Sequence, residues 1–268
     1  MNLTNPEIEK EAQLLYLAER KRTQMSATTV RYPNMTIADA YAIQKQGIEL
    51  KKQAGRTVVG YKIGLTSRVM QRSMKINEPD YGILMDDMVF DEGAEIVAAN
   101  FLDPRVEVEL AFMLHTPLKG EHITIFDVLR ATEYVIPAVE LIAARTFRVH
   151  PETKYVRNVC DTIADNAANA GIIVGGRPMK PDAVDLRWIG AMLYKNGVLE
   201  ETGLAAGVLN HPAKGIAWLA KKYAAYGMGL EAGKIILAGS FTSALVAQAG
   251  DTFHIDFGKM GSFGIKFV

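Results

Sequence analysis

The sequence predicts an α+β fold with a helical N-terminal region and a core made mostly of strands. Residues 1–55 contain two stretches whose apolar side chains recur at helical spacing. From residue 56 onward, short apolar runs alternate with glycines and turn residues, which is typical of strands. No repeat, low-complexity stretch or linker interrupts this second part. We therefore expect a helical arm over residues 1–55 and one continuous core over residues 56–268.

The N-terminal arm is expected to hold two helices. Asn5 is suited to cap the first helix, and Pro6 then lies in its first turn. Thr36 followed by Asp39 resembles a capping box, which predicts the start of the second helix. Gly55 is expected to end that helix, because glycine tolerates the backbone conformation that commonly follows a last turn.

The core is expected to consist of strands with one long helix near its C-terminal end. Five apolar runs bounded by turn residues predict the first strands: residues 57–65, 80–89, 105–114, 134–142 and 171–175. The pair Asn196-Gly197 predicts a β-hairpin. A helix is expected from Pro212 to Gly227. Three further strands are expected in residues 234–238, 252–257 and 263–267.

Composition and charge indicate that the partner is a small molecule. The chain has 30 basic and 30 acidic residues and no basic run, so there is no electrostatic case for binding nucleic acid. No apolar run approaches membrane-spanning length, and the N-terminus lacks a signal-peptide pattern. Cys160 is the only cysteine, which excludes an intrachain disulfide and fits a reducing cytosol. We expect a cytoplasmic protein that does not bind a membrane. Cys160 is expected to be a buried apolar side chain.

Three glutamates in predicted strands are the strongest indication of a functional site. Strand alternation places Arg105, Glu107 and Glu109 on one face, which on its own fits an ordinary solvated strand face. Glu140 lies in a run of apolar residues, where an unpaired carboxylate would be costly. A structural salt bridge, for example to Arg105 or Arg145, is one solution. A divalent cation held by three carboxylates is the other, and oxygen ligands favour Mg²⁺ or Mn²⁺ over Zn²⁺.

Lys62 and Asp80 are candidates for proton transfer. Lys62 lies inside an apolar, glycine-flanked strand, and Asp80 lies at the start of another apolar segment. Lys62 alone fits a side chain that extends to the surface, and Asp80 alone fits a turn residue. If the two meet in the site, their opposite charges hold both ionised and ready to exchange protons with a substrate.

Other polar residues receive structural interpretations. His211 precedes a proline and His254 lies on an alternating strand, so both are expected to be structural. Residues 258–261 lack the spacing of a phosphate-binding loop, which argues against nucleotide binding. The segment from Asp161 to Gly171 is poor in bulky side chains, and it fits either a capped support for the sheet or a substrate contact.

Several motifs together resemble one protein family. The chain is similar nearly end to end to the hydratase and decarboxylase branch of the fumarylacetoacetate hydrolase superfamily. The segments that carry this resemblance are GYKIGLTS (60–67), EPDYG (78–82), RVEVELAF (105–112), YVIPAVEL (134–141), DTIADNAANAG (161–171), EETG (200–203), VLNHP (208–212) and GSFT (239–242).

The resemblance implies a fold and a site. The fold implied is a mixed β-roll or barrel core of the superfamily's C-terminal type with a helical N-terminal region. The site implied is a Mg²⁺ or Mn²⁺ ion held by Glu107, Glu109 and Glu140, with Lys62 and Asp80 in the acid-base positions. The resemblance also implies a homo-oligomer, for which a ring-based decamer built from dimers is one form, and association with a decarboxylase of the same pathway.

The activity implied is that of a hydro-lyase of aromatic catabolism. The reaction expected is addition of water to 2-oxohept-4-ene-1,7-dioate, which gives 4-hydroxy-2-oxoheptanedioate in the degradation of homoprotocatechuate. A 2-oxo acid can chelate the metal, which then stabilises negative charge on the keto oxygen. The alternatives are hydration of 2-hydroxypenta-2,4-dienoate, 4-oxalocrotonate-type decarboxylation, hydrolysis of a C–C bond, and a non-catalytic role as a subunit of a decarboxylase complex.

One departure from the family pattern concerns the substrate's second carboxylate. In dicarboxylate hydratases a basic residue tends to follow the Gly-Ser-Phe-Thr segment, whereas here Ser243 and Ala244 follow it. A dianionic substrate needs a cation at its far end, which Arg68, Arg72 or another basic group could supply. The remaining candidate substrate contacts are Asp161 and Thr162.

Overall fold

Three helices precede the first strand in the computed structural model, which describes residues 1–268. They are α1 (Asn5–Lys21), α2 (Thr28–Arg31) and α3 (Ile37–Gln53). The residue before α1 is Thr4, whose N–H donates to the Glu7 carboxylate at 2.8 Å, so the predicted cap Asn5 is wrong by one residue. The second cap is confirmed, because the Thr36 hydroxyl oxygen accepts from Asp39 N–H and Thr36 N–H donates to the Asp39 carboxylate.

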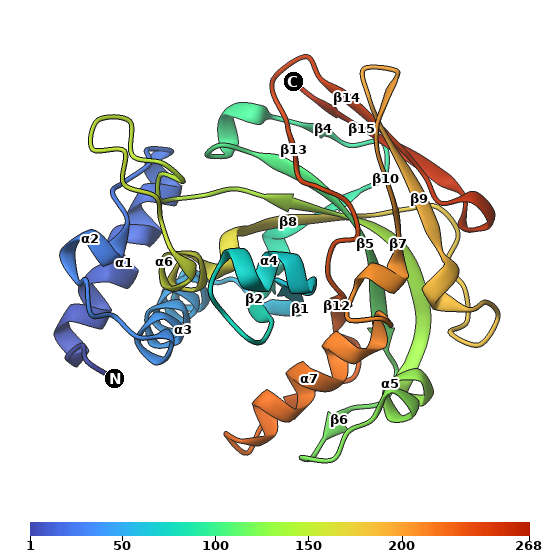
Figure 1. The fold of residues 1–268 in the computed structure, drawn as a ribbon, viewed down its shortest axis with the longest axis horizontal. Helices are drawn as coiled ribbons and strands as arrows, with labels where there is room; N and C mark the ends of the chain where they lie inside the picture. Colours follow the sequence, from blue (N-terminus) through green and yellow to red (C-terminus); the bar gives the residue numbers. More distant parts are fainter.

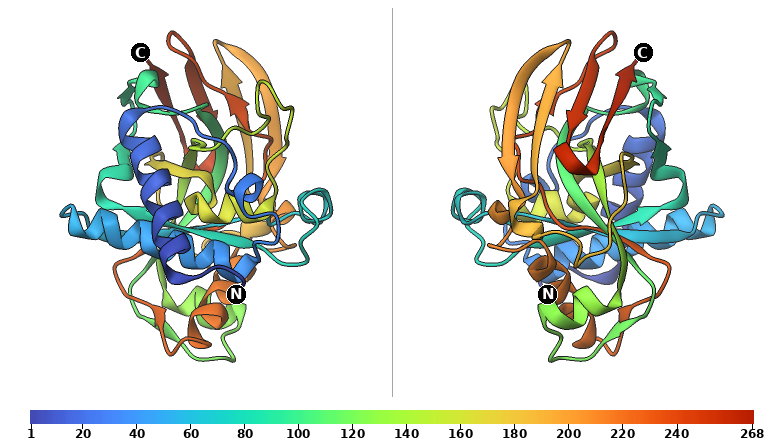
Figure 2. Two further views of the ribbon diagram at one scale, coloured as in Figure 1. Left: turned by 90° about the vertical axis from the view of Figure 1, so that its left-hand side faces the viewer. Right: turned by 90° about the vertical axis from the view of Figure 1, so that its right-hand side faces the viewer.

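A large mixed sheet forms the centre of the molecule (Figure 1). Its strand order is β2-β1-β12-β5-β7-β8-β3, with β13 added to one end of β5. The strands are β1 (Val58–Gly64), β2 (Asp80–Met85), β3 (Val89–Asp91), β5 (Arg105–Leu114), β7 (Thr132–Ile142), β8 (Asn169–Val174), β12 (Ile235–Leu237) and β13 (Leu245–Val246). The long antiparallel pair of β5 and β7 crosses the molecule, and the sheet curls into a half barrel (Figure 2).

A second sheet closes over the core from the C-terminal part of the chain. Its order is β10-β9-β14-β15-β4, and a two-stranded ribbon of β6 and β11 stands apart. These strands are β4 (Glu95–Ile96), β6 (Leu118–Lys119), β9 (Gly190–Lys195), β10 (Val198–Leu204), β11 (Gly229–Leu230), β14 (Thr252–Asp256) and β15 (Ser262–Phe267). The predicted hairpin is confirmed, since Asn196 and Gly197 join β9 to β10 with positive φ. Buried side chains of both sheets, such as Phe112 and Phe253, belong to one core.

Four further helices lie between the strands. They are α4 (Arg68–Ser73), α5 (Ile125–Ala131), α6 (Val159–Ala164) and α7 (Ala213–Ala224). α7 corresponds to the helix expected from Pro212 to Gly227, and it packs against α5 and β1. None of the helices has the length and apolar character needed to cross a membrane. The α+β prediction is confirmed.

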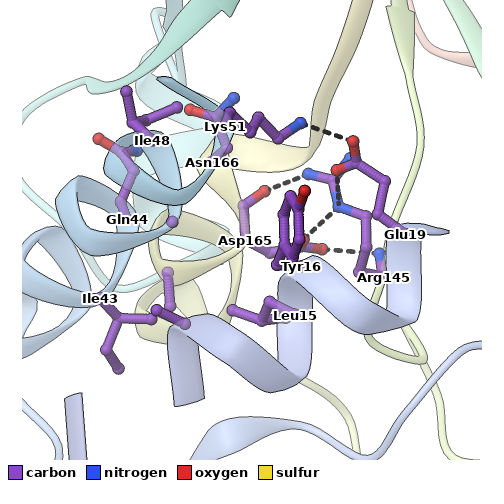
Figure 3. Close-up of a pocket in the computed structure, with 13 residues that line it drawn as sticks. Leu15, Tyr16, Glu19, Ile43, Gln44, Ile48, Lys51, Arg145, Asp165 and Asn166 are labelled. Atoms are coloured by element: carbon purple, nitrogen blue, oxygen red, sulfur yellow. Dashed lines mark hydrogen bonds and ion pairs between the residues drawn. The ribbon is translucent and has the colours of Figure 1, made fainter. Parts of the chain in front are cut away.

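The N-terminal helices join the sheet through α6. Apolar residues of α1 and α3 form one buried cluster with α6, and Cys160 belongs to this cluster as a buried free thiol. A pocket lies where α1 and α3 meet the segment after β7, and Figure 3 shows Arg145 in it between Asp165 and Glu19. The helix α6, which belongs to the predicted core, therefore packs with the N-terminal helices. The predicted boundary between an arm over residues 1–55 and a core over residues 56–268 stays a prediction.

Candidate metal centre and active site

Three carboxylates from two adjacent strands converge at the centre of the sheet. Glu107 on β5 lies directly opposite Glu140 on β7 in the antiparallel register, and Glu109 is two residues further along the same face of β5. One ligand oxygen from each of the three lies within 4.8 Å of the other two. Glu109 and Glu140 are each only 1% exposed, and Glu107 is half-buried. The sequence could predict each strand face, but only the register brings the three together.

Electrostatics at this cluster favours a bound cation. Burial and the neighbouring Glu140 raise the pKa of Glu107 to about 7, although Lys62 and Arg148 oppose this rise. Burial, Glu140 and Glu107 raise the pKa of Glu109 well above its ordinary value. Crowded buried carboxylates resist ionisation unless positive charge is added. An all-oxygen donor set that carries this much negative charge fits a hard divalent cation.

The protein's own cations neutralise the three glutamates only in part, because the one ion pair that reaches them runs from Lys62 to Glu140. Lys62 Nζ lies 3.1 Å from Glu140 Oε1, but this oxygen receives no hydrogen bond. The expected salt bridge of Glu140 is present, but its partner is Lys62, and the proposed partners Arg105 and Arg145 are wrong. Arg145 pairs with Asp165, and Arg105 lies 3.6 Å from Asp103.

The segment after β12 supports Glu109 through its backbone. Gly239 N–H donates to Glu109 Oε2 at 2.8 Å. Gly239 has φ +118°, and an added Cβ would lie 2.5 Å from Thr66, so glycine is required here. The side chain of Ser240 donates to the carbonyl of Val108, which ties the segment to β5 between the two glutamates. Sequence analysis recognised this motif but not its contact with the site.

Lys62 and Asp80 come together beside the glutamates. They lie on the antiparallel strands β1 and β2, where Gly64 is the register partner of Asp80. A Cβ added to Gly64 would lie 2.2 Å from Asp80 Oδ1 and 3.3 Å from Lys62 Nζ, so both polar groups reach the space above this glycine. They do not form a direct ion pair, and Asp80 Oδ1 has no hydrogen-bond partner.

The charges of this pair are set by burial and by each other. Burial raises the pKa of Asp80 to about 6, with Lys62 opposing the rise and Glu140 adding to it. Burial disfavours the charged form of Lys62, but Glu140 and Asp80 outweigh it and raise its pKa. Lys62 is therefore a cation at neutral pH. Asp80 titrates close enough to neutrality to both accept and return a proton.

The predicted contacts from Asp161 and Thr162 find no support in this geometry. Asp161 is fully buried, and its two oxygens accept hydrogen bonds from the N–H and hydroxyl of Thr29 and from Asn158 N–H. Thr162 donates its hydroxyl to the carbonyl of Asn158 at 3.3 Å. Of the two interpretations of residues 161–171, the structure favours the capped support, because Asn158 caps α6.

Arg68 and Arg72 lie on α4, which has no buried residue. Both arginines are exposed, and neither forms an ion pair. Their role as substrate contacts stays a prediction. His211 is structural as expected, since its Nδ1 accepts from Ala213 N–H and burial lowers its pKa.

Comparisons with known proteins identify the family of this chain. No family model matches the chain. A 2-oxo-hept-4-ene-1,7-dioate hydratase of Escherichia coli, however, is 59% identical over 257 residues, which cover 96% of each chain. The chain belongs to the hydratase and decarboxylase branch of the fumarylacetoacetate hydrolase superfamily.

Other members of this branch match as completely. A 2-hydroxyhexa-2,4-dienoate hydratase of Comamonas testosteroni is 37% identical over 97% of each chain. Among solved structures, 4-oxalocrotonate decarboxylase of Pseudomonas putida G7, complexed with magnesium and adipate, has a TM-score of 0.94 at 32% identity. That match covers 100% of this chain and 99% of the other. The predicted superfamily fold is confirmed.

Proposed function

We propose that this chain is a divalent-metal-dependent hydratase that converts 2-oxohept-4-ene-1,7-dioate to 4-hydroxy-2-oxoheptanedioate. The observation that carries the proposal is the 59% identity to a hydratase of this substrate over almost the whole chain. The three converging carboxylates and the neighbouring Lys62 and Asp80 supply the chemistry that this reaction needs.

Glu107, Glu109 and Glu140 would hold the metal ion, for which we propose Mg²⁺. Mn²⁺ would suit the same oxygen donors. When bound, the cation would supply Lewis-acid stabilisation of negative charge that develops on the keto oxygen of the substrate. Gly239 N–H fixes the orientation of Glu109 within this set.

Asp80 and Lys62 would move the protons. The substrate's double bond lies between C4 and C5, so a proton must leave C3 and one must reach C5 to form the α,β-unsaturated ketone. Water then adds at C4, and a proton returns to C3. We assign the base to Asp80, because its pKa of about 6 leaves it ionised at neutral pH. Lys62, cationic and 5% exposed, would orient and charge-balance this carboxylate.

Decarboxylation is the second candidate function. A 4-oxalocrotonate decarboxylase of Pseudomonas putida is 36% identical over 251 residues, which is well below the identity to the hydratase. The same metal could stabilise the enolate that remains after loss of CO₂. The presence of both activities in one family motivates our proposal that the chain associates with a decarboxylase of its pathway. We also propose that the chain forms a homo-oligomer.

The test is product analysis with metal-stripped protein. The protein is incubated separately with 2-oxohept-4-ene-1,7-dioate, 2-hydroxypenta-2,4-dienoate and 4-oxalocrotonate, with and without Mg²⁺. We expect 2-oxohept-4-ene-1,7-dioate to gain one water in a Mg²⁺-dependent reaction. The gain is monitored by product mass and by dienol absorbance. Release of CO₂ from 4-oxalocrotonate without hydration of either compound would instead favour the decarboxylase. No reaction with any of the three would favour a non-catalytic partner subunit.

A further inference from the structure

Three arginines beside the metal centre hold buried donor atoms that no group of the protein accepts. They are Arg105, Arg148 and Arg157, called the arginine cluster below. The buried atoms without a hydrogen-bond partner are Arg105 Nε, Arg148 Nη2 and Arg157 Nη1. Buried polar groups in native proteins nearly always have a partner, so three free guanidinium donors in one place indicate an anionic ligand.

The chain brings this cluster together from two segments. Arg105 lies on β5 two residues before Glu107, on the same face of the strand. Arg148 and Arg157 lie in the loop between β7 and α6, where Arg157 N–H donates to the carbonyl of Arg148. Arg148 Nε donates to Asp103 at 2.5 Å, and Arg105 Nη2 lies 3.6 Å from the same carboxylate.

The positive charge of the cluster exceeds the negative charge of the carboxylates that it contacts. The Asp103 carboxylate forms ion pairs with both Arg105 and Arg148. The one carboxylate within 4 Å of the Arg157 guanidinium is Asp165, which lies 3.7 Å from Nη1 without a hydrogen bond to it. Asp165 is already engaged by Arg145, as Figure 3 shows. The Arg157 side chain is only 8% exposed, so it is largely removed from bulk solvent and an unmade hydrogen bond there is costly.

Arg145 shows by contrast what a satisfied guanidinium looks like in this part of the fold. Its Nε donates to the Asp165 carboxylate, Nη1 to the carbonyl of Asn169 and Nη2 to the carbonyl of Asp165. It therefore has no donor group left without a partner. Arg157, whose Nη1 lies 3.7 Å from Asp165 Oδ2, has no comparable set.

The cluster lies close enough to the glutamates and to Asp80 to affect their pKa values. The charge of Arg148 opposes the rise in the pKa of Glu107, and that of Arg157 opposes the rise in the pKa of Asp80.

The distance along β5 also fits a dicarboxylate. Cα atoms two residues apart on a strand, such as those of Arg105 and Glu107, are separated by about 7 Å. This spacing is comparable with the distance between the two carboxylates of an extended seven-carbon dicarboxylate.

We infer that the arginine cluster binds the C7 carboxylate of the substrate while its 2-oxo acid end lies at the three glutamates. The inference rests on the hydratase function proposed above and names the residues that select a dicarboxylate. It also supplies a cation for the far carboxylate, whereas Ser243 and Ala244 after the Gly-Ser-Phe-Thr segment are uncharged. Guanidinium groups suit this role because they remain charged when buried and bind carboxylates through paired N–H groups.

The test compares two substrates that differ in the distal carboxylate. Steady-state kinetics of the full-length protein with saturating Mg²⁺ is measured on 2-oxohept-4-ene-1,7-dioate and on 2-hydroxypenta-2,4-dienoate. Arg157→Met is expected to raise KM for the dicarboxylate roughly 10- to 100-fold, as loss of a charged hydrogen bond does. The kcat/KM for the dicarboxylate divided by that for 2-hydroxypenta-2,4-dienoate, called the substrate ratio below, should fall by the same factor. Arg157→Lys, which keeps the charge, should recover part of the ratio.

Two further variants keep the test decisive. Arg148→Met should shift the substrate ratio in the same direction, so the test stands even if Arg157→Met does not fold. Arg130→Met is the matched control, because Arg130 is 79% exposed on α5 and pairs only with Asp127. It should leave the ratio at the wild-type value.

A binding measurement separates recognition from turnover. With Mg²⁺ present, adipate should raise the Tm of the wild-type protein more than hexanoate does, and Arg157→Met should abolish this difference. An unchanged substrate ratio in both arginine variants, or equal losses on both substrates, would overturn the inference. If the wild type hydrates neither substrate, the proposed function itself has failed, which is a different result from an active wild type with an unaltered ratio in the variants.

Discussion

Gly64 provides a sharp test of the way Lys62 and Asp80 cooperate. Its Cα faces the space that both polar groups reach, and its φ is not positive, so the backbone itself accepts alanine. A Cβ at this position would lie 2.2 Å from Asp80 Oδ1, whereas ordinary contact begins at 3.4 Å. The Asp80 carboxylate must therefore withdraw by about 1.2 Å in the Gly64→Ala variant.

The size of this displacement sets the expected loss of activity. A misplacement of about 1 Å in a catalytic group can reduce the rate by on the order of a hundredfold. The clashing atom is the end of a side chain, so the fold should tolerate the change with only a small decrease in Tm. We therefore expect kcat to fall by one to two orders of magnitude, roughly, while Mg²⁺ affinity changes little.

Gly47→Ala is the matched control for this experiment. Gly47 lies inside α3, and nothing lies within 4 Å of an added Cβ. Alanine there should raise stability by about 0.5–1 kcal/mol through its helix propensity and leave kcat unchanged. The assay is steady-state hydration at saturating Mg²⁺, with thermal unfolding of each variant. A Gly64→Ala protein with wild-type kcat would refute the assignment of Asp80 as the base.

The remaining predictions concern the charged groups of the centre. Lys62→Met should lower kcat by on the order of a hundredfold in the steady-state assay, and full turnover would remove Lys62 from the mechanism. Glu140→Gln should weaken Mg²⁺ binding in calorimetric titration, and an unchanged affinity would count against the three-glutamate site. Below about pH 6, kcat/KM should fall tenfold per pH unit because Asp80 becomes protonated, whereas a flat profile down to pH 5 would contradict that role. In the metal-free protein the Glu107 pKa of about 7 exceeds the ordinary 4.5, so its contribution to stability is complete below pH 4.5 and is lost as the pH rises to 7. The Tm of metal-free protein should therefore decrease over this range and be restored by Mg²⁺, and a Tm that increases would contradict the predicted shift.

The sequence pointed to the individual candidate site residues because each is a charged side chain in a segment that reads as a strand. Glu140 is charged within an apolar run, and Glu107 alternates with buried valines, so both could be identified without a structure. The pairing of Glu107 with Glu140 was not predictable, since it depends on the register between two strands separated by a long connection. The partner of Glu140 was predicted wrongly for the same reason. Lys62 reaches it from β1, which is not a neighbour of β7 in the sheet.

Contacts between distant segments account for the other differences. Asp161 looked like a substrate contact because it opens a segment of small residues, but it accepts hydrogen bonds from Thr29, which is far away in the sequence. The arginine cluster was missed because Arg148 and Arg157 lie in a loop without periodicity, whose path is fixed only by tertiary contacts. Short helices such as α4 and α5 were also missed, since six or seven residues give too little pattern.

The most direct test of the central claim is to locate the metal. Crystals of the protein grown with Mn²⁺ would be measured at a wavelength where manganese scatters anomalously. We predict one strong peak among the carboxylates of Glu107, Glu109 and Glu140, at about 2.0–2.2 Å from their oxygens as is usual for such an ion, and its loss in Glu140→Gln. A peak elsewhere, or none among these three residues, would contradict the account of this site as a metal-dependent hydratase centre.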